Sequence, residues 1–179
     1  MSSVVIAGNT SGTITLDAPN VAGTTVLTLP TANGTVLTTA TPFSNGQGPA
    51  FSAYQSSGQT LGTATYTKIL FQTEEWDTNS NFASSTFTPT VAGYYQINAV
   101  VRAPQNGELA VIIYKNGSNY KVGNNVNTTA VYSMGVSALV YFNGSTDYAE
   151  IYVFSSVAST PTVTGANYTY FQGFLARAA

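Results

Sequence analysis

Several segments of this chain are apolar on both faces of the strand that each predicts, which limits the folds open to it. Successive side chains of a strand alternate between two faces. In 94–102 one face carries Tyr95, Ile97, Ala99 and Val101, and the other carries Tyr94, Gln96, Asn98, Val100 and Arg102. Segments 108–115, 136–142 and 149–154 are also apolar on both faces. A half-solvated sheet should alternate apolar with polar residues. We therefore expect other copies of the chain to cover the second face, in an odd, ring-closing assembly.

The chain carries little charge, and this narrows the partners that it can have. It is 44% hydrophobic and 7% charged, with five basic and seven acidic residues, whereas about 25% of an average soluble protein is charged. Without a basic patch we expect no nucleic-acid partner. No apolar run approaches the roughly 20 residues of a membrane-spanning helix, so we expect no membrane partner either. The low charge favours a surface that lies against protein.

The residue types needed for most catalytic sites are missing. The chain has neither Cys nor His, which excludes disulfides, thiolate metal sites and His-dependent nucleophilic catalysis. Glu74, Glu75 and Asp77 cluster around Trp76. This cluster allows three interpretations: a solvated loop, a weak Ca²⁺ site built from carboxylate oxygens, or a glycosidase pair beside a sugar-stacking Trp. The loop interpretation is favoured, and we expect no enzyme, no cofactor and no firm metal site.

Short strands with Asn- and Gly-based turns predict an all-β sandwich or barrel. Turn signals occur at 92–93, 105–107, 115–117 and 143–144. The strands that we expect are 50–55, 66–72, 82–88, 94–102, 108–115, 131–142, 147–154 and 168–176. The expected organisation is an arm at 1–42, a linker at 43–49 and a head at 50–179.

Residues 1–42 contain a sequence repeat that the rest of the chain lacks. Gly12, Gly23 and Gly34 each open a unit of eleven residues that reads as a short strand followed by a turn. Repeats of this kind mark units that cannot bury a face alone. The segment is either a low-complexity leader or an ordered β arm that packs against copies of itself or a larger partner.

The region 47–179 resembles the globular head of complement C1q and the wider tumour necrosis factor-like family. Segment 49–55 resembles the first strand of that head. Phe87, Pro89, Gly93 and Tyr95 fit the family's hairpin motif, and Phe171, Gly173, Phe174 and Leu175 fit its closing strand. The resemblance implies a ten-strand jelly-roll sandwich that forms a tight homotrimer.

The arm resembles leader segments of bacteriophage virion proteins that precede trimeric heads. This resemblance implies a structural protein of the virion, either a capsid decoration (cement or head-fibre) protein or a fibre tip. We favour a non-enzymatic capsid decoration protein, attached to the major capsid protein or another virion protein, because the chain is short and shows no shaft. The start of the chain lacks a basic n-region, so we expect a virion protein assembled in the host cytoplasm.

Two sets of residues are candidates for these contacts. For attachment to the particle we expect Val4, Val5, Ile6, Ile14, Leu16, Val26, Leu27, Leu29, Val36 and Leu37. For the trimer interface we expect Tyr95, Ile112, Tyr114, Tyr141, Tyr152, Phe171 and Phe174. The alternative function is a tail fibre or host-recognition adhesin that binds glycans or receptors through loops at 124–129 and 155–165.

Overall fold

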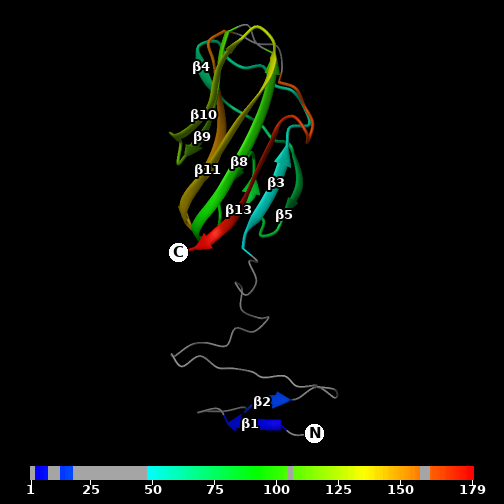
Figure 1. Ribbon diagram of the computed structural model, residues 1–179, viewed down its shortest axis with the longest axis vertical. Helices are drawn as coiled ribbons and strands as arrows, with labels where there is room; N and C mark the ends of the chain where they lie inside the picture. Colours follow the sequence, from blue (N-terminus) through cyan, green and yellow to red (C-terminus); the bar gives the residue numbers. More distant parts are fainter. Residues whose placement is uncertain (1–2, 8–12, 18–47, 105–106, 158–161) are drawn as a thin grey trace, which may run out of the picture. The chain divides into compact units, whose positions relative to one another are not determined.

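The computed structural model divides the chain into two compact units, residues 1–37 and 38–179 (Figure 1). It describes residues 3–7, 13–17, 48–104, 107–157 and 162–179. In the first unit, strands β1 (Ser3–Ala7) and β2 (Thr13–Asp17) form a two-stranded antiparallel sheet. Its register pairs Val4 with Leu16 and Ile6 with Ile14.

The second unit, the head, is a sandwich of two antiparallel sheets. The five-stranded sheet has the order β11-β8-β13-β3-β5. Its strands are β3 (Ala50–Tyr54), β5 (Thr73–Asp77), β8 (Ala92–Pro104), β11 (Val131–Asn143) and β13 (Tyr170–Ala178). The six-stranded sheet has the order β10-β9-β12-β7-β6, with β4 also paired to β12. Its strands are β4 (Thr65–Lys68), β6 (Phe82–Ala83), β7 (Thr86–Phe87), β9 (Gly107–Lys115), β10 (Ser118–Thr128) and β12 (Ala149–Ser155). The all-β sandwich is confirmed.

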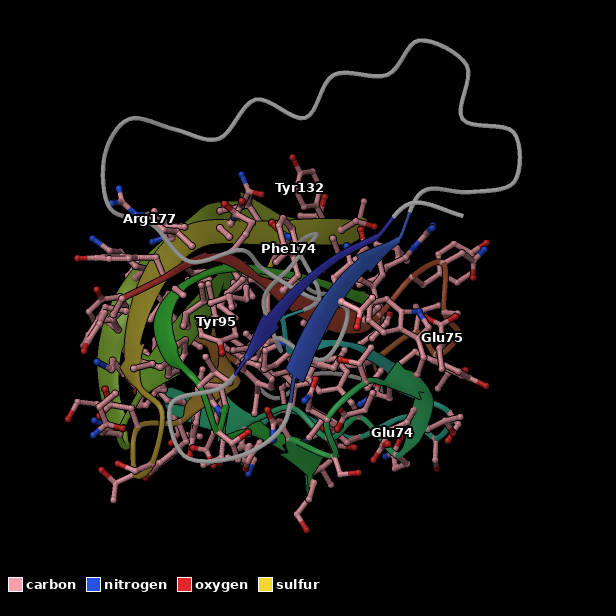
Figure 2. The ribbon with its side chains drawn as sticks, turned by 90° about the horizontal axis from the view of Figure 1, so that it is seen from below. Glu74, Glu75, Tyr95, Tyr132, Phe174 and Arg177 are labelled. Carbon is pink, nitrogen blue, oxygen red and sulfur yellow. The ribbon has the colours of Figure 1, made fainter. Side chains whose placement is uncertain are left out.

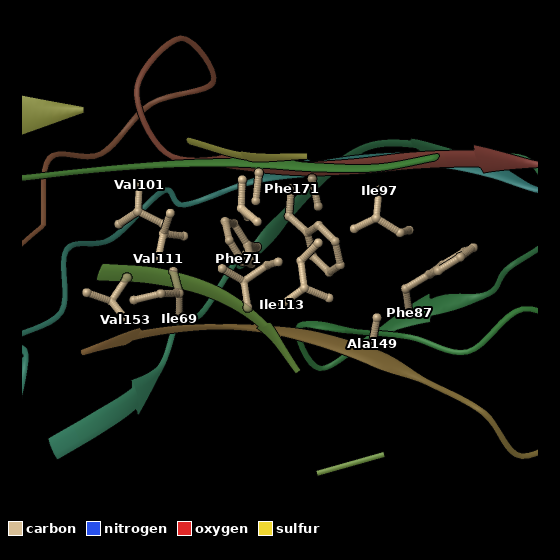
Figure 3. Packing of buried hydrophobic residues seen from close by; sticks show 14 of the residues in the cluster. Ile69, Phe71, Phe87, Ile97, Val101, Val111, Ile113, Ala149, Val153 and Phe171 are labelled. Carbon is tan, nitrogen blue, oxygen red and sulfur yellow. The ribbon is translucent and has the colours of Figure 1, made fainter. Parts of the chain in front are cut away.

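The core lies between the two sheets, as Figure 3 shows. The predicted inner face of β8 is confirmed, because Tyr95, Ile97, Ala99 and Val101 are buried. Opposite them, β9 and β12 contribute Val111, Ile113 and Val153, which are also buried. Aromatic rings fill one region of this core: Phe51 stacks on Phe87 with ring centroids 4.3 Å apart and meets Phe171 edge-on at 4.8 Å.

Tight turns connect several of these strands. Asn116 and Gly117 join β9 to β10 with φ values of 52° and 75°. Positive φ at both central residues is what a two-residue hairpin turn of the right twist requires, and Asn-Gly meets it readily. Ser84 and Ser85 make the turn between β6 and β7 in the same region of φ, 51° and 59°. The segment predicted as one strand at 82–88 is therefore two short paired strands.

Two predicted loops are strands in the structure. Residues 73–77, read as a loop around Trp76, form β5, and residues 124–128, read as part of an exposed loop, belong to β10. Both strands lie at the edge of a sheet. Edge strands carry charged and polar residues that discourage pairing with other chains, so these segments read as loops from composition alone.

Within the residues that the structure describes, no helix has the length and apolar character needed to cross a membrane.

Candidate interaction surface

The outer face of the five-stranded sheet exposes large apolar side chains from three neighbouring strands. Tyr94 on β8, Leu139 and Tyr141 on β11, and Phe174 on β13 are 43%, 54%, 40% and 49% exposed. Alternation along each strand produces this face, because the neighbours Tyr95 and Val140 point into the core, and Gly173, the neighbour of Phe174, is buried. Figure 2 shows Phe174 on the outer side of this sheet and Tyr95 on the inner side. Clustered apolar surface of this kind marks an interaction site.

The strand register brings these exposed apolar residues next to one another. Tyr94 lies opposite Tyr141 on β11, and Gln96 lies opposite both Leu139 on β11 and Phe174 on β13. The rings of Tyr94 and Tyr141 are 5.4 Å apart. A groove runs beside them, lined by Tyr94, Leu139, Tyr141 and residues 176–179. The exposed rings and the groove therefore lie side by side at one end of this face.

Polar side chains occupy the middle of the same face. Ser137 Oγ donates a hydrogen bond to Asn98 Oδ1 at 2.8 Å. Gln96 Nε2 donates to Ser137 Oγ at 2.9 Å and to Asn98 Oδ1 at 3.2 Å. Next to this network lies a shallow depression, whose lining includes Asn98, Ser137, Tyr170 and Gln172. The face is therefore amphipathic rather than uniformly apolar.

Arg102 is the cation at the far end of β8 on this face. Its guanidinium lies over the ring of Tyr168, 4.7 Å from the ring centroid. Its Nε is buried and has no hydrogen-bond partner among the described residues. Stacking against an aromatic ring partly compensates a desolvated cation. The charge is thus held against the head's own surface.

The outer face of the six-stranded sheet carries an aromatic cluster formed by Tyr66, Tyr114, Tyr152 and Phe154. Tyr114 and Tyr152 are stacked with centroids 3.9 Å apart, and Tyr66 lies 5.2 Å from Phe154 and 6.2 Å from Tyr114. Ile112 lies opposite Tyr152 in the register and is only 1% exposed. Burial raises the pKa of Tyr114 and of Tyr152 above 10.0, with a contribution from neighbouring Tyr66 or Glu150. This cluster covers its own sheet and still leaves Tyr66 half exposed.

The structure distributes the residues expected at the trimer interface over three places. Tyr141 and Phe174 lie on the outer face of the five-stranded sheet. Ile112, Tyr114 and Tyr152 lie on the outer side of the other sheet. Tyr95 and Phe171 are fully buried in the core of the single chain. Tyr94 and Leu139 were not expected here, although alternation in 94–102 had placed Tyr94 on the second face.

The attachment candidates belong to the first unit. Val4, Val5 and Ile6 lie on β1, and Ile14 and Leu16 lie on β2. The other five, Val26, Leu27, Leu29, Val36 and Leu37, lie outside the described residues. In the loop predicted at 155–165, residues 158–161 also lie outside the described part, while Val163 N donates to the Arg102 carbonyl at 2.8 Å.

The structure does not assemble the acidic cluster into a metal site. Glu75 accepts a hydrogen bond from Ser52 Oγ at 2.7 Å. Asp77 accepts bonds from the backbone N–H groups of Asn79 and Phe82, at 3.2 and 2.7 Å. No group of three acidic side chains able to hold a cation occurs in the described part of the chain. These carboxylates therefore organise the β5 edge and the turn after it.

One ion pair links strands β4 and β12 of the six-stranded sheet, and a second links the end of β9 to the segment before β12. Lys68 Nζ lies 2.7 Å from Glu150 and also donates to Thr86 Oγ1 at 2.8 Å. Lys115 Nζ lies 2.9 Å from Asp147. Hydrogen bonds from Asn116 and Lys115 hold the pKa of Asp147 below its ordinary value of 3.8. The carboxylates of Glu150 and Asp147 therefore stabilise the six-stranded sheet and the segment next to it.

Comparisons with known proteins identify the fold of the head. No family model matches the chain, and no curated protein matches it in sequence. The globular domain of zebrafish complement 1qA protein is similar in structure, with a TM-score of 0.58 and 17% identity over 73% of this chain and 99% of that one. Murine APRIL (TM-score 0.58, 8% identity, 71% and 98% covered) and Eiger TNF from S. frugiperda (0.59, 8%, 74% and 95%) are also similar. The head therefore has the C1q and TNF-like jelly-roll fold.

Proposed function

We propose that this chain, whose head has the C1q and TNF-like jelly-roll fold, is a non-enzymatic structural protein that assembles as a homotrimer. The observation that carries the proposal is the exposed apolar face of the five-stranded sheet, with Tyr94, Leu139 and Phe174 between 43% and 54% exposed. Burying such surface releases roughly 25 cal/mol for each Å² removed from water. Association through this face would bury what a lone head leaves in water.

A second copy of the chain is the occupant that we propose for this face. In the described part of the chain, the cations at or beside this face are Arg102, which is stacked on Tyr168, Arg177 at the groove, and Lys115, whose Nζ lies 5.8 Å from the Tyr141 ring centroid and is paired with Asp147. With so little charge the face offers nothing to attract a highly charged partner. The C1q-like motifs around Phe87 and Phe171 also imply trimers. A ring-closing arrangement uses two different patches of each copy, so a broad face and a sheet edge can both contribute.

We propose further that the arm attaches the trimer to a bacteriophage particle as a capsid decoration protein. A two-stranded sheet is at best marginally stable in water by itself, so a partner would stabilise β1–β2. Strand addition to a capsid protein would supply one, through backbone hydrogen bonds and insertion of apolar side chains. The resemblance of residues 2–39 to phage leader segments supports a virion assembled in the host cytoplasm.

The copy number of this chain per purified particle tests the virion proposal. Quantitative mass spectrometry against the major capsid protein should give about one chain or one trimer for each capsomer-scale site. Removing residues 1–42 should abolish binding to particles and leave the head trimeric. A handful of copies per particle would contradict decoration and favour a tail position.

The second candidate function is a tail fibre or adhesin that binds surface glycans or receptors. The aromatic cluster (Tyr66, Tyr114, Tyr152 and Phe154) favours it, because tyrosine rings offer apolar faces together with hydroxyl groups. The cluster lies on the sheet opposite the proposed trimer face, so it would stay accessible in the assembly. Glycan-array binding that survives removal of the arm and is lost in Tyr66→Ala would support adhesion. An array without binding would count against it.

A further inference from the structure

A row of polar side chains crosses the apolar face from one edge of the five-stranded sheet to the other. The strand register places Ser137 opposite Asn98, Asn98 opposite Gln172, and Gln172 opposite Ser52. Ser52 Oγ then donates a hydrogen bond to Glu75 Oε2 on β5, at 2.7 Å. We call this row the polar belt: Ser137, Asn98, Gln172, Ser52 and Glu75. Leu139 and Phe174 lie on one side of it, and Val100 and Tyr170 lie on the other.

Two members of the polar belt, Asn98 on β8 and Glu75 on the edge strand β5, have opposite hydrogen-bonding character. Asn98 Oδ1 already accepts from Ser137 and Gln96, so the remaining group of Asn98 is its Nδ2 donor. In the part of the chain that the structure describes, this donor has no hydrogen-bond partner, and neither has the second carboxylate oxygen of Glu75. Glu75 is exposed, and Asn98 lines the open depression. Asn98 thus offers a donor and Glu75 an acceptor.

Ring-closing symmetry about an axis parallel to the strands would bring Asn98 of one copy and Glu75 of its neighbour together. Rotation about an axis parallel to the strands leaves each residue at its own height along that axis, and a head-to-tail interface joins one edge of a copy to a different patch of the next. The strand register runs the polar belt across the strands, so Asn98 and Glu75 would lie at nearly the same height along such an axis. The β5 edge of one copy can therefore meet the β8–β11 region of its neighbour with donor opposite acceptor.

We propose that Glu75 of one copy accepts a hydrogen bond from the Asn98 side chain of the next, and that this contact sets the register and copy number of the assembly. The inference rests on the proposed self-association. Apolar contacts are non-directional, so the rings around Tyr94 and Phe174 alone allow copies to slide or rotate. A buried polar pair specifies one alignment, because any other leaves the donor and the carboxylate desolvated without partners.

Exchanging donor and acceptor tests the contact in the full chain. Asn98→Asp puts two carboxylates opposite each other but can still accept from Ser137 and Gln96. We expect it to raise the dissociation constant of the trimer on the order of a hundredfold. Glu75→Gln keeps the shape and should raise it about tenfold or less. The double variant reverses the polarity of the bond and should return the constant to within roughly threefold of the wild type.

Glu74→Gln is the matched control, since Glu74 neighbours Glu75 on β5 but makes no hydrogen bond to the polar belt among the described residues. Native mass spectrometry over a dilution series measures all five proteins. Rescue of Asn98→Asp by Glu75→Gln, with Glu74→Gln unchanged, supports the contact. Two results would overturn this inference alone, with the wild type still trimeric: a trimer that is as stable in Asn98→Asp as in the wild type, or a double variant whose dissociation constant stays as high as that of Asn98→Asp. A monomeric or dimeric wild type overturns the proposed trimer as well.

Discussion

Tyr94 and Tyr95 are neighbours in the sequence and lie on opposite sides of the same sheet. Tyr95 is buried: its ring packs against Phe87 and Phe142, and its hydroxyl donates to the Val91 carbonyl at 2.8 Å. Burial raises its pKa to about 12. Tyr94 is exposed on the outer face. One residue stabilises the fold and the other is available for association, and only the alternation of the strand separates the two roles.

We expect Tyr95→Phe to lower the free energy of unfolding by about 1 kcal/mol, because the Val91 carbonyl loses its partner in a partly buried place. Chemical denaturation measures the change. Tyr94→Phe is the control, since no hydrogen bond of the Tyr94 hydroxyl occurs among the described residues, and it should leave stability unchanged. An effect of Tyr94→Phe as large as that of Tyr95→Phe would contradict this assignment.

Asp147 makes stability depend on pH in the acid range. Its carboxylate accepts from Asn116 Nδ2 at 2.8 Å and from Asn143 N at 3.1 Å and pairs with Lys115, which lowers its pKa from 3.8. A carboxyl whose pKa is lowered by folding stabilises the protein above its unfolded pKa, and this stabilisation is lost as pH falls through the folded pKa. Asp147→Asn should therefore lower the melting temperature at pH 7, and the gap to the wild type should close below pH 3.8. Thermal unfolding between pH 7 and pH 2 measures it, and a constant gap would argue against this role.

At the scale of elements, the β6–β7 hairpin carries a turn that its sequence does not favour. Ser84 and Ser85 both have positive φ, a region that costs a non-Gly residue about 1–2 kcal/mol and that Asn tolerates better. Ser85 Oγ donates to and accepts from Phe71, whereas Ser84 uses its carbonyl, which accepts from Lys68. Ser84→Asn should stabilise the head by about 0.5 kcal/mol. Ser85→Ala should destabilise it by about 1–3 kcal/mol, because a buried N–H loses its partner. Denaturant midpoints measure both, and a destabilising Ser84→Asn would refute the turn argument.

The elements that the sequence predicted well are those in the middle of the sheets. In 94–102 and 108–115 the inner-facing residues are apolar, and this period survives in β8 and β9. The edge strands β5 and β10 were missed, because charged and polar residues protect an edge from pairing and look like loop residues. The sequence predicts even less well which outer-facing apolar residues are exposed in the single chain. Ile112 is covered by its own chain, whereas Leu139 is exposed. Both lie in segments that are apolar on both faces, so the sequence pattern does not distinguish them.

For the whole molecule, a charge placed on the proposed trimer face should dissociate it without unfolding the head. Leu139 is 54% exposed in one copy, so Leu139→Asp should change the stability of the head by less than about 0.5 kcal/mol. Buried in the assembly, the same carboxylate would be costly. Val122→Asp is the matched control, an aliphatic residue 56% exposed on the other sheet. Sedimentation velocity should show monomers for Leu139→Asp and trimers for Val122→Asp, and identical behaviour of the two would contradict the choice of face.

The most direct test of the central claim is the mass of the wild-type chain in dilute solution, by light scattering on a sizing column. Self-association through the outer face of the five-stranded sheet predicts a particle of three times the chain mass of 18.7 kDa. This mass should persist at moderate salt, because burial of apolar surface rather than surface charge drives the association. A particle with the mass of one chain at every concentration would contradict the account.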